Sequence, residues 1–206
     1  MKEILLTEFV EFADQAYPDA RRDPGGRPGD PPDDGGSDGD TERRFLALAG
    51  RVGDAAGRSR AEVLRRFGAH LFWRFAAIYP VFFRGPTDPL AFLARVHADV
   101  HGSLRLFHPE ASLPELRCSS PAPGRLVLDY RSERPLADLA EGLVEGCVEF
   151  FGGGVEVTRE DPPDGAGRTA RFVLVRPDGR RSGSGRRTER GADPSATRGH
   201  STRARP

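Results

Sequence analysis

The sequence predicts an α+β domain, because helical periodicity in its first half gives way to strand-like alternation in its second half. Up to about residue 104, apolar residues recur every three or four positions. Beyond Pro114 the period changes, and Leu126, Leu128 and Tyr130 occupy every second position, as in a half-buried strand. A chain of 206 residues is long enough to form one such domain around its own core.

Charge and composition exclude several classes of protein. Lys and Arg total 31, as do Asp and Glu, so neither a basic nucleic-acid binder nor an acidic solvating chain is expected. No apolar run approaches the roughly 20 residues that span a bilayer, and the first residues lack the apolar stretch of a signal peptide. Cys118 and Cys147 are too few for a disulfide scaffold and lack zinc-finger spacing. We therefore expect a cytoplasmic protein with no nucleic-acid or membrane partner.

Two segments are not expected to pack. Residues 18–40 hold a single apolar residue, Ala20, and residues 178–206 consist largely of Gly, Ser and Arg. Neither segment buries enough apolar surface to offset the roughly 1–2 kcal/mol per residue that ordering the backbone costs. The predicted domain therefore spans residues 1–177, with a disordered insert at 18–40 and a disordered basic tail at 178–206.

Three helices are predicted before residue 80. The first covers residues 3–17, with an apolar face made by Leu5, Phe9, Phe12 and Ala16. The second follows Thr41, and its apolar face carries Phe45, Leu48 and Val52. The third begins at a capping-box pattern, Ser59 with Glu62, and runs to Ile78 before Pro80.

The rest of the domain combines two helices with strands. Asp88 followed by Pro89 starts a fourth helix, which continues through Leu104 and ends by Pro109. A strand at 126–130 precedes a helix over 136–150, which a run of three glycines, 152–154, brings to an end. Residues 155–158 and 169–175 are predicted to form a hairpin around a turn-rich connection.

Histidines lie on the apolar face of the fourth predicted helix. His97 and His101 are four residues apart, and His108 follows seven residues later on the same side. A buried imidazole needs a partner, because an unsatisfied polar group costs about 1–3 kcal/mol. Three interpretations are open: hydrogen-bonded core histidines, a metal site that uses His97 and His101, or one axial imidazole to haem iron.

A polar motif follows the strand at 126–130. Alternation places Tyr130, Ser132 and Arg134 on one side of the chain, where a phenol, a hydroxyl and a guanidinium converge. These donors suit a pair of carboxylates, since arginine binds one of them bidentately. The alternative is a solvated strand end in which Arg134 pairs with Glu133 or Asp138.

Apolar residues from different helices are candidates to line one cavity. They are Leu5, Phe9, Leu71, Phe75, Leu139 and Val144. Each of them is also compatible with an ordinary core, and none of these side chains carries a hydrogen-bond donor.

In this order the motifs resemble the haem-nitric oxide/oxygen binding (H-NOX) family, which includes the haem domain of soluble guanylate cyclase and stand-alone bacterial gas sensors. The similar segments, within residues 1–17 and 41–176, are MKEILLTEFVEF, FGAHLFWRFAAIYPVFFRG, FLARVHADVHGSLRLFHPEASLPELRC, YRSER and PLADLAEGLVEGCVEFFG. The resemblance implies an N-terminal helical subdomain, a C-terminal four-stranded antiparallel sheet with helices, and haem b (iron protoporphyrin IX) between them.

Carried over by position, the resemblance makes His101 the iron ligand and gives His97, one turn earlier, a supporting or core role. Pro114 matches the proline that presses on the macrocycle and distorts it. The residues that match the family's propionate-binding triad are Tyr130, Ser132 and Arg134.

The resemblance also implies which gas binds. Oxygen-binding members place distal hydrogen-bond donors at positions held here by Phe9, Leu71 and Leu139, and Leu139 takes the place of the distal tyrosine. Bound oxygen carries partial negative charge and is stabilised by a donor, whereas nitric oxide and carbon monoxide need none. We therefore expect nitric oxide and carbon monoxide as ligands of a five-coordinate ferrous haem, with Leu5 and Phe75 completing the pocket wall.

In this family nitric oxide weakens or breaks the iron–histidine bond, which releases the helix that carries the ligand. Gly102, directly after His101, is the residue expected to let that helix shift. No effector fits within 206 residues, so we expect a separate partner such as a histidine kinase, a diguanylate cyclase or a guanylate cyclase-like protein. The chain itself is then not an enzyme. Family members have helices in place of residues 18–40, so a thinner distal side is expected here.

Two other functions stay open. A metal-dependent hydrolase would use His97 and His101, although the sequence shows no paired carboxylates, nucleophile elbow or phosphate loop. A relative that has lost its cofactor would be a non-haem ligand-binding or interaction domain. A Soret band that His101→Ala removes would indicate a haem protein, bound zinc without that band a hydrolase, and neither of them the third class.

Overall fold

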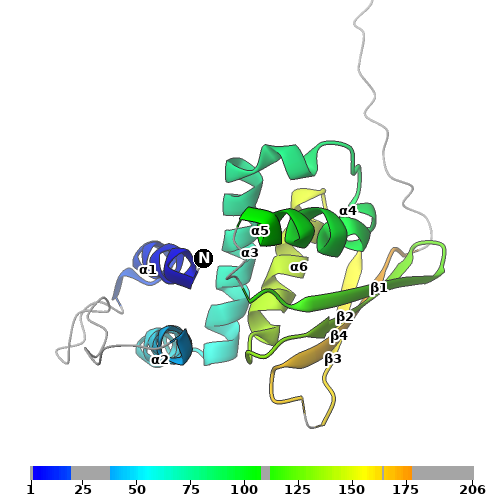
Figure 1. Ribbon diagram of the computed structural model, residues 1–206. Coiled ribbons are helices and arrows are strands. Elements are labelled where there is room, and N and C mark those ends of the chain that lie inside the picture. Colours follow the sequence, from blue (N-terminus) through cyan, green and yellow to red (C-terminus); the bar gives the residue numbers. More distant parts are fainter. Residues whose placement is uncertain (1, 20–37, 108–111, 164, 178–206) are drawn as a thin grey trace, which may run out of the picture.

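The computed structural model describes residues 2–19, 38–107, 112–163 and 165–177, and its fold is α+β, as predicted (Figure 1). Three long helices come first: α1 (Lys2–Ala16), α2 (Asp38–Ala56) and α3 (Arg60–Ile78). Figure 1 shows α1 and α2 on one side of α3, with α6 and the sheet on its other side. None of the described helices is both long and apolar enough to cross a membrane.

The helical subdomain, α1, α2 and the first half of α3, has a core built around aromatic rings. The rings of Phe9 and Phe67 are 5.0 Å apart between centroids, and those of Phe9 and Phe45 are 5.2 Å apart, both edge to face. Edge-to-face pairs at this spacing add to the gain from burial itself. The predicted apolar faces of the first three helices therefore meet in one core.

The capping box predicted for the third helix is confirmed. The Ser59 Oγ accepts a hydrogen bond from the Glu62 backbone N–H at 3.2 Å, and the Glu62 carboxylate accepts one from the Ser59 N–H at 3.0 Å. The second helix, by contrast, begins at Asp38, so the last three residues of the 18–40 segment are helical. Acidic residues suit the first turn of a helix, because they complement its dipole. Residues 20–37 and 178–206 lie outside the described residues.

The fourth predicted helix is divided by a π-helical turn. It consists of α4 (Pro89–Val96), the π turn η3 (His97–His101) and α5 (Gly102–Phe107), and the short 3-10 turn η2 (Pro80–Phe83) precedes it. Asp88 caps α4, because its Oδ1 accepts from the N–H groups of Leu90 and Ala91 at 2.9 and 3.1 Å. His108 and Pro109 lie outside the described residues. The sequence pattern did not predict the π turn, which holds both of the described histidines of this helix.

The second half of the chain forms one antiparallel sheet with a helix packed on it. The strands β1 (Glu115–Ala122), β2 (Arg125–Arg131), β3 (Glu156–Glu160) and β4 (Thr169–Val175) lie in the order β1-β2-β4-β3. The helix α6 (Ala137–Phe150), the strand at 126–130 and the hairpin of β3 and β4 confirm the predictions. No separate strand was predicted at 115–122, because most of its side chains are exposed and its alternation is weak.

Helices α3 and α6 approach each other more closely than most side chains allow. A Cβ atom added to Gly142 would overlap the carbonyl oxygen of Arg65, and one added to Gly68 would overlap the carbonyl oxygen of Leu139. A Cβ atom on Gly146 would lie 2.9 Å from the carbonyl oxygen of Ala69. The glycines of α3 and α6 therefore permit a direct backbone contact between the two helices.

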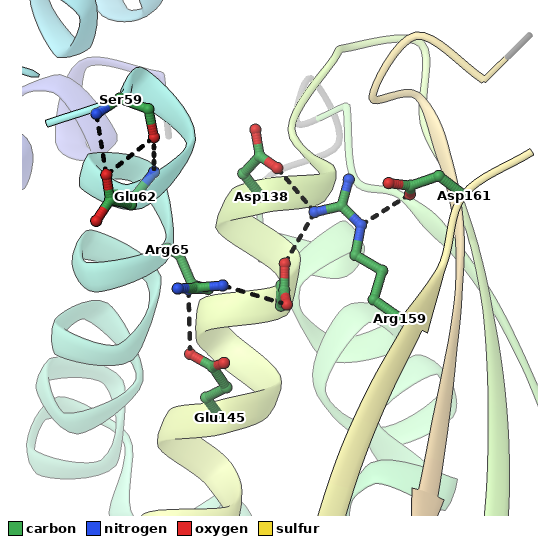
Figure 2. Close-up of polar contacts among 8 residues, drawn as sticks. Ser59, Glu62, Arg65, Asp138, Glu145, Arg159 and Asp161 are labelled. Atoms are coloured by element: carbon green, nitrogen blue, oxygen red, sulfur yellow. Dashed lines mark hydrogen bonds and ion pairs between the residues drawn. The ribbon is translucent and has the colours of Figure 1, made fainter. Parts of the chain in front are cut away.

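An ionic network also joins these helices to the sheet (Figure 2). Arg159 of β3 donates to the carboxylates of Asp138 and Glu141 on α6 at 2.7 and 2.9 Å. Arg65 of α3 lies 3.6 Å from Glu141 and 3.8 Å from Glu145. Since Arg159 is only 13% exposed, its contacts are the less screened part of the network. The network therefore connects both α3 and β3 to α6.

We expect Gly142→Ala to lower the free energy of unfolding by about 1–3 kcal/mol, because the added methyl group separates α3 from α6. The matched control is Gly50→Ala on α2, where nothing lies within 4 Å of the new methyl group. That control should raise stability by about 0.5–1 kcal/mol, because alanine loses less backbone entropy than glycine in a helix. Urea unfolding followed by circular dichroism measures both, and equal effects would contradict the close contact.

Candidate functional site

A cavity of about 270 Å³ is lined by residues from α1 and α3 and from the part of the chain that follows α3, which holds the sheet. Its wall is contributed by α3 and α6, by α4 with the π turn and α5, and by the sheet. The structure brings together most of the residues that the sequence singled out. Those that line the cavity are Leu5, Leu71, Phe75, His101, Pro114, Tyr130, Ser132, Arg134, Leu139 and Val144.

His101 is the last residue of the π turn, and it places an imidazole in the cavity wall. Its Nδ1 is buried and has no hydrogen-bond partner among the residues that the structure describes. Burial lowers the pKa of His101 to about 4, and the nearby His97 and Arg105 act in the same direction. At neutral pH the imidazole is therefore uncharged and carries a free lone pair, the form that binds a metal ion.

His97, one turn earlier, is engaged differently. Its Nδ1 accepts a hydrogen bond from the Leu116 N–H of β1 at 3.4 Å, and its ring centroid lies 5.9 Å from that of His101. His97 is not among the residues that line the cavity. Within the described ranges, no group of three or more His, Cys, Asp or Glu side chains is placed to hold a metal ion. The metal-site interpretation thus depends on the two histidines alone.

The polar motif lies at the rim of the cavity, in the turn that follows β2. The strand ends at Arg131, so the three side chains converge through this turn and not through strand alternation alone. The Ser132 N–H donates to the carbonyl of Arg168 at 2.8 Å, and the Ser132 Oγ accepts from the Arg134 N–H at 3.0 Å. Burial raises the pKa of Tyr130, so its phenol stays protonated and can donate a hydrogen bond.

Arg134 has a carboxylate partner that the sequence did not indicate. Its Nε lies 3.1 Å from Glu42 of α2, and the two side chains are only 15% and 21% exposed. Asp138, one of the two partners considered from the sequence, pairs instead with Arg159. Glu42 is far from Arg134 along the chain, so no local pattern could have revealed this contact.

The part of the wall that comes from α3 and α6 is mainly apolar. Leu71 and Phe75 come from α3, while Leu139 and Val144 come from α6. The prediction that Phe9 lines the same cavity is wrong. Phe9 is fully buried in the helical core, and Leu5, one turn earlier on α1, reaches the cavity instead.

Sequence reasoning missed many lining residues that have no motif of their own, among them Tyr79, Val100 and Leu143. Tyr79 follows Phe75 by one turn at the end of α3, so continuing the helical stripe past Phe75 would have found it. Val100 and Leu143 occur on predicted helical faces but were not assigned to the cavity. Of these three, Tyr79 alone carries a hydroxyl group.

These residues fit a flat, largely apolar group that carries both a metal ion and carboxylates. An uncharged imidazole with an orphaned nitrogen stands on one wall. A phenol, a hydroxyl and a guanidinium stand at the rim, and apolar side chains fill most of the remaining wall. A haem group needs this combination of an axial ligand, donors for its two carboxylates and an apolar enclosure.

Comparison with solved structures shows the same fold in H-NOX proteins. A variant of the unliganded Fe(II) protein from K. algicida is 20% identical, with a TM-score of 0.70 over 87% of this chain and 98% of that one. A variant from T. tengcongensis is 23% identical, with a TM-score of 0.65 over 84% and 95%. The Fe(II)NO form of an S. oneidensis protein is 16% identical, with a TM-score of 0.62 over 82% and 88%.

A search of curated proteins found no match to the chain. A family model described as Haem-NO-binding, however, matches residues 41–159. The matched segment covers more than half of the chain, from α2 to β3, and contains His101 and the polar motif of residues 130–134. This chain therefore belongs to the haem-NO-binding (H-NOX) family.

Proposed function

We propose that this protein is a cytosolic, haem-based gas sensor that binds haem b in the cavity, with His101 as the axial ligand. The observation that carries the proposal is the buried Nδ1 of His101, an uncharged nitrogen without a partner among the described residues. A buried imidazole nitrogen without a hydrogen-bond partner is destabilising, and binding a metal ion would satisfy it.

The rim residues would hold the two carboxylates of the haem. Arg134 supplies charge and a planar pair of donors, and Tyr130 and Ser132 supply hydroxyl groups. Pro114, directly before β1, lines the same cavity as His101 and would press on the macrocycle. His97 accepts the Leu116 N–H, which leaves His101 as the imidazole that faces the cavity.

When bound, the haem would supply a ferrous iron able to bind a gas molecule, and His101 would hold that iron. H-NOX proteins from S. oneidensis are described in Fe(II)NO and Fe(II)CO forms. The side chains of Leu71, Phe75 and Leu139 in this chain offer no hydrogen-bond donor to bound oxygen. This wall supports a preference for nitric oxide and carbon monoxide over oxygen.

The π turn is a suitable element to transmit ligand binding. It ends at His101, and Gly102 continues into α5 with ordinary helical backbone angles. π turns are rare inside α-helices and frequently occur at functional sites. We propose that loss of the bond to His101 lets α5 move, and that a separate effector such as a histidine kinase, a diguanylate cyclase or a guanylate cyclase-like protein responds.

His101→Ala should abolish the Soret band of protein purified after expression with added haem precursor, because the axial ligand is lost. Exogenous imidazole should restore the band, since the substitution leaves a space in the wall. His97→Ala is the matched control and should keep the band, because His97 does not line the cavity. A normal spectrum for His101→Ala, or a colourless wild-type protein from haem-replete cells, would contradict the proposed function.

The ferrous protein should bind nitric oxide and carbon monoxide but form no stable oxy complex in air, because Leu71, Phe75 and Leu139 offer no donor to oxygen. Leu139→Tyr should create an oxy complex that absorption spectroscopy detects. Tyr79→Phe is the control for the hydroxyl group that α3 does place in the wall. A persistent oxy spectrum in the wild type would reject the proposed selectivity, and its loss in Tyr79→Phe would identify the donor.

A further inference from the structure

The ion pair between Arg134 and Glu42 joins the cavity rim to the helical subdomain. Arg134 lines the cavity, whereas Glu42 does not. The carboxylate of Glu42 lies 3.1 Å from the Arg134 Nε, and the Glu42 side chain is 21% exposed. Arg134 therefore contacts an acid of the helical subdomain and also lines the space that the haem carboxylates would fill.

Arg134 needs such a partner because it is long, flexible and largely buried. The arginine side chain loses about 2 kcal/mol of rotamer entropy when it is held in one position. Its charge is also costly to bury without a partner. Asp138 pairs with Arg159 at 2.7 Å and Glu133 is exposed, so neither of these two residues takes the place of Glu42.

The pairing also leaves donors of Arg134 available. A guanidinium has five N–H donors in a fixed planar fork, and the contact with Glu42 is made through Nε. The remaining donors can bind a second carboxylate without loss of the first. Different donors of one guanidinium can thus bind Glu42 and a haem carboxylate at the same time, and the bond to Glu42 would orient the guanidinium plane.

We propose that Glu42 is a positioning residue for haem binding, which holds Arg134 toward the haem carboxylates and makes haem retention depend on the docking of α2. This inference rests on the proposed function. Glu42 lies in the first turns of α2 in the helical subdomain, while Arg134 follows strand β2 of the sheet. A displacement of α2 would withdraw the acid, free the arginine and loosen the grip on the cofactor.

The test compares the rates at which haem-loaded variants transfer haem to an excess of a scavenging apoprotein. Glu42→Gln should release haem about five- to tenfold faster than the wild type, as expected for loss of one partly buried, charge-assisted contact. Glu42→Asp keeps the charge on a shorter side chain and should restore part of the wild-type rate. Glu42→Gln combined with Arg134→Ala should release haem no faster than Arg134→Ala alone, because both changes remove the same contact.

Glu8→Gln is the matched control for a general loss of stability. Glu8 of α1 accepts two hydrogen bonds from Arg74 of α3 at 2.8 and 2.9 Å, so this pair also ties helices together, but neither residue lines the cavity. The control should lower the thermal stability of the apoprotein by at least as much as Glu42→Gln. Its rate of haem release should stay within about twofold of the wild type, because Arg134 is untouched.

Two results would overturn the assignment. One is a wild-type release rate in Glu42→Gln while Arg134→Ala releases haem quickly. The other is equal acceleration by Glu8→Gln, which would reduce the role of Glu42 to helix docking in general. If Glu42→Gln does not fold, Glu42→Ala is measured in its place, and a wild-type rate of haem release there overturns the proposal. Failure of the wild-type protein to take up haem is a distinct result, which would reject the proposed function itself.

Discussion

The contact between α3 and α6 is the constraint on which the rest of the structure depends. Gly68, Gly142 and Gly146 let the two backbones touch, and side chains at these positions would push the helices apart. Because the two backbones are in contact, Leu71 of α3 and Leu139 of α6 line the same cavity. The same pair of helices separates the helical core around Phe9 from the core beneath the sheet.

The chemistry of the cavity depends on the different hydrogen-bonding of two neighbouring histidines. The imidazole of His97 accepts a hydrogen bond from the backbone of β1, while that of His101 has a buried nitrogen with no partner in the described part of the chain. Both histidines belong to the π turn. The same cavity is lined by apolar side chains of α3 and α6 and by Arg134, which pairs with Glu42. His97 and Arg134 therefore each have a partner within the protein, whereas the Nδ1 of His101 has none among the described residues.

Most of the fold could be predicted from the sequence because its signals are local. The Ser59–Glu62 capping box and the Asp88 cap are contacts within a few residues, and both are confirmed. The last predicted helix ends at Phe150, just before the glycine run, as expected. The π turn was missed because it has the same periodicity and composition as the α-helix around it. The strand β1 was missed because an edge strand with exposed side chains carries little alternation. In both cases the hydrogen bonds that define the element are not encoded by side-chain type.

By itself the sequence determined the α+β class and singled out the histidines at 97 and 101 and the donors at 130, 132 and 134, since these depend on residue types at short spacings. The choice of His101 as the candidate iron ligand came from the resemblance to the H-NOX family. Only the tertiary structure decided which candidates share a cavity. It placed Phe9 in the helical core and Leu5 in the cavity wall, although both lie on one face of the same helix. It also brought Glu42 to Arg134, a contact between two subdomains that no spacing along the chain could indicate. The physical reason is that burial and ion pairing depend on how whole helices dock, and docking is set by the sum of many contacts.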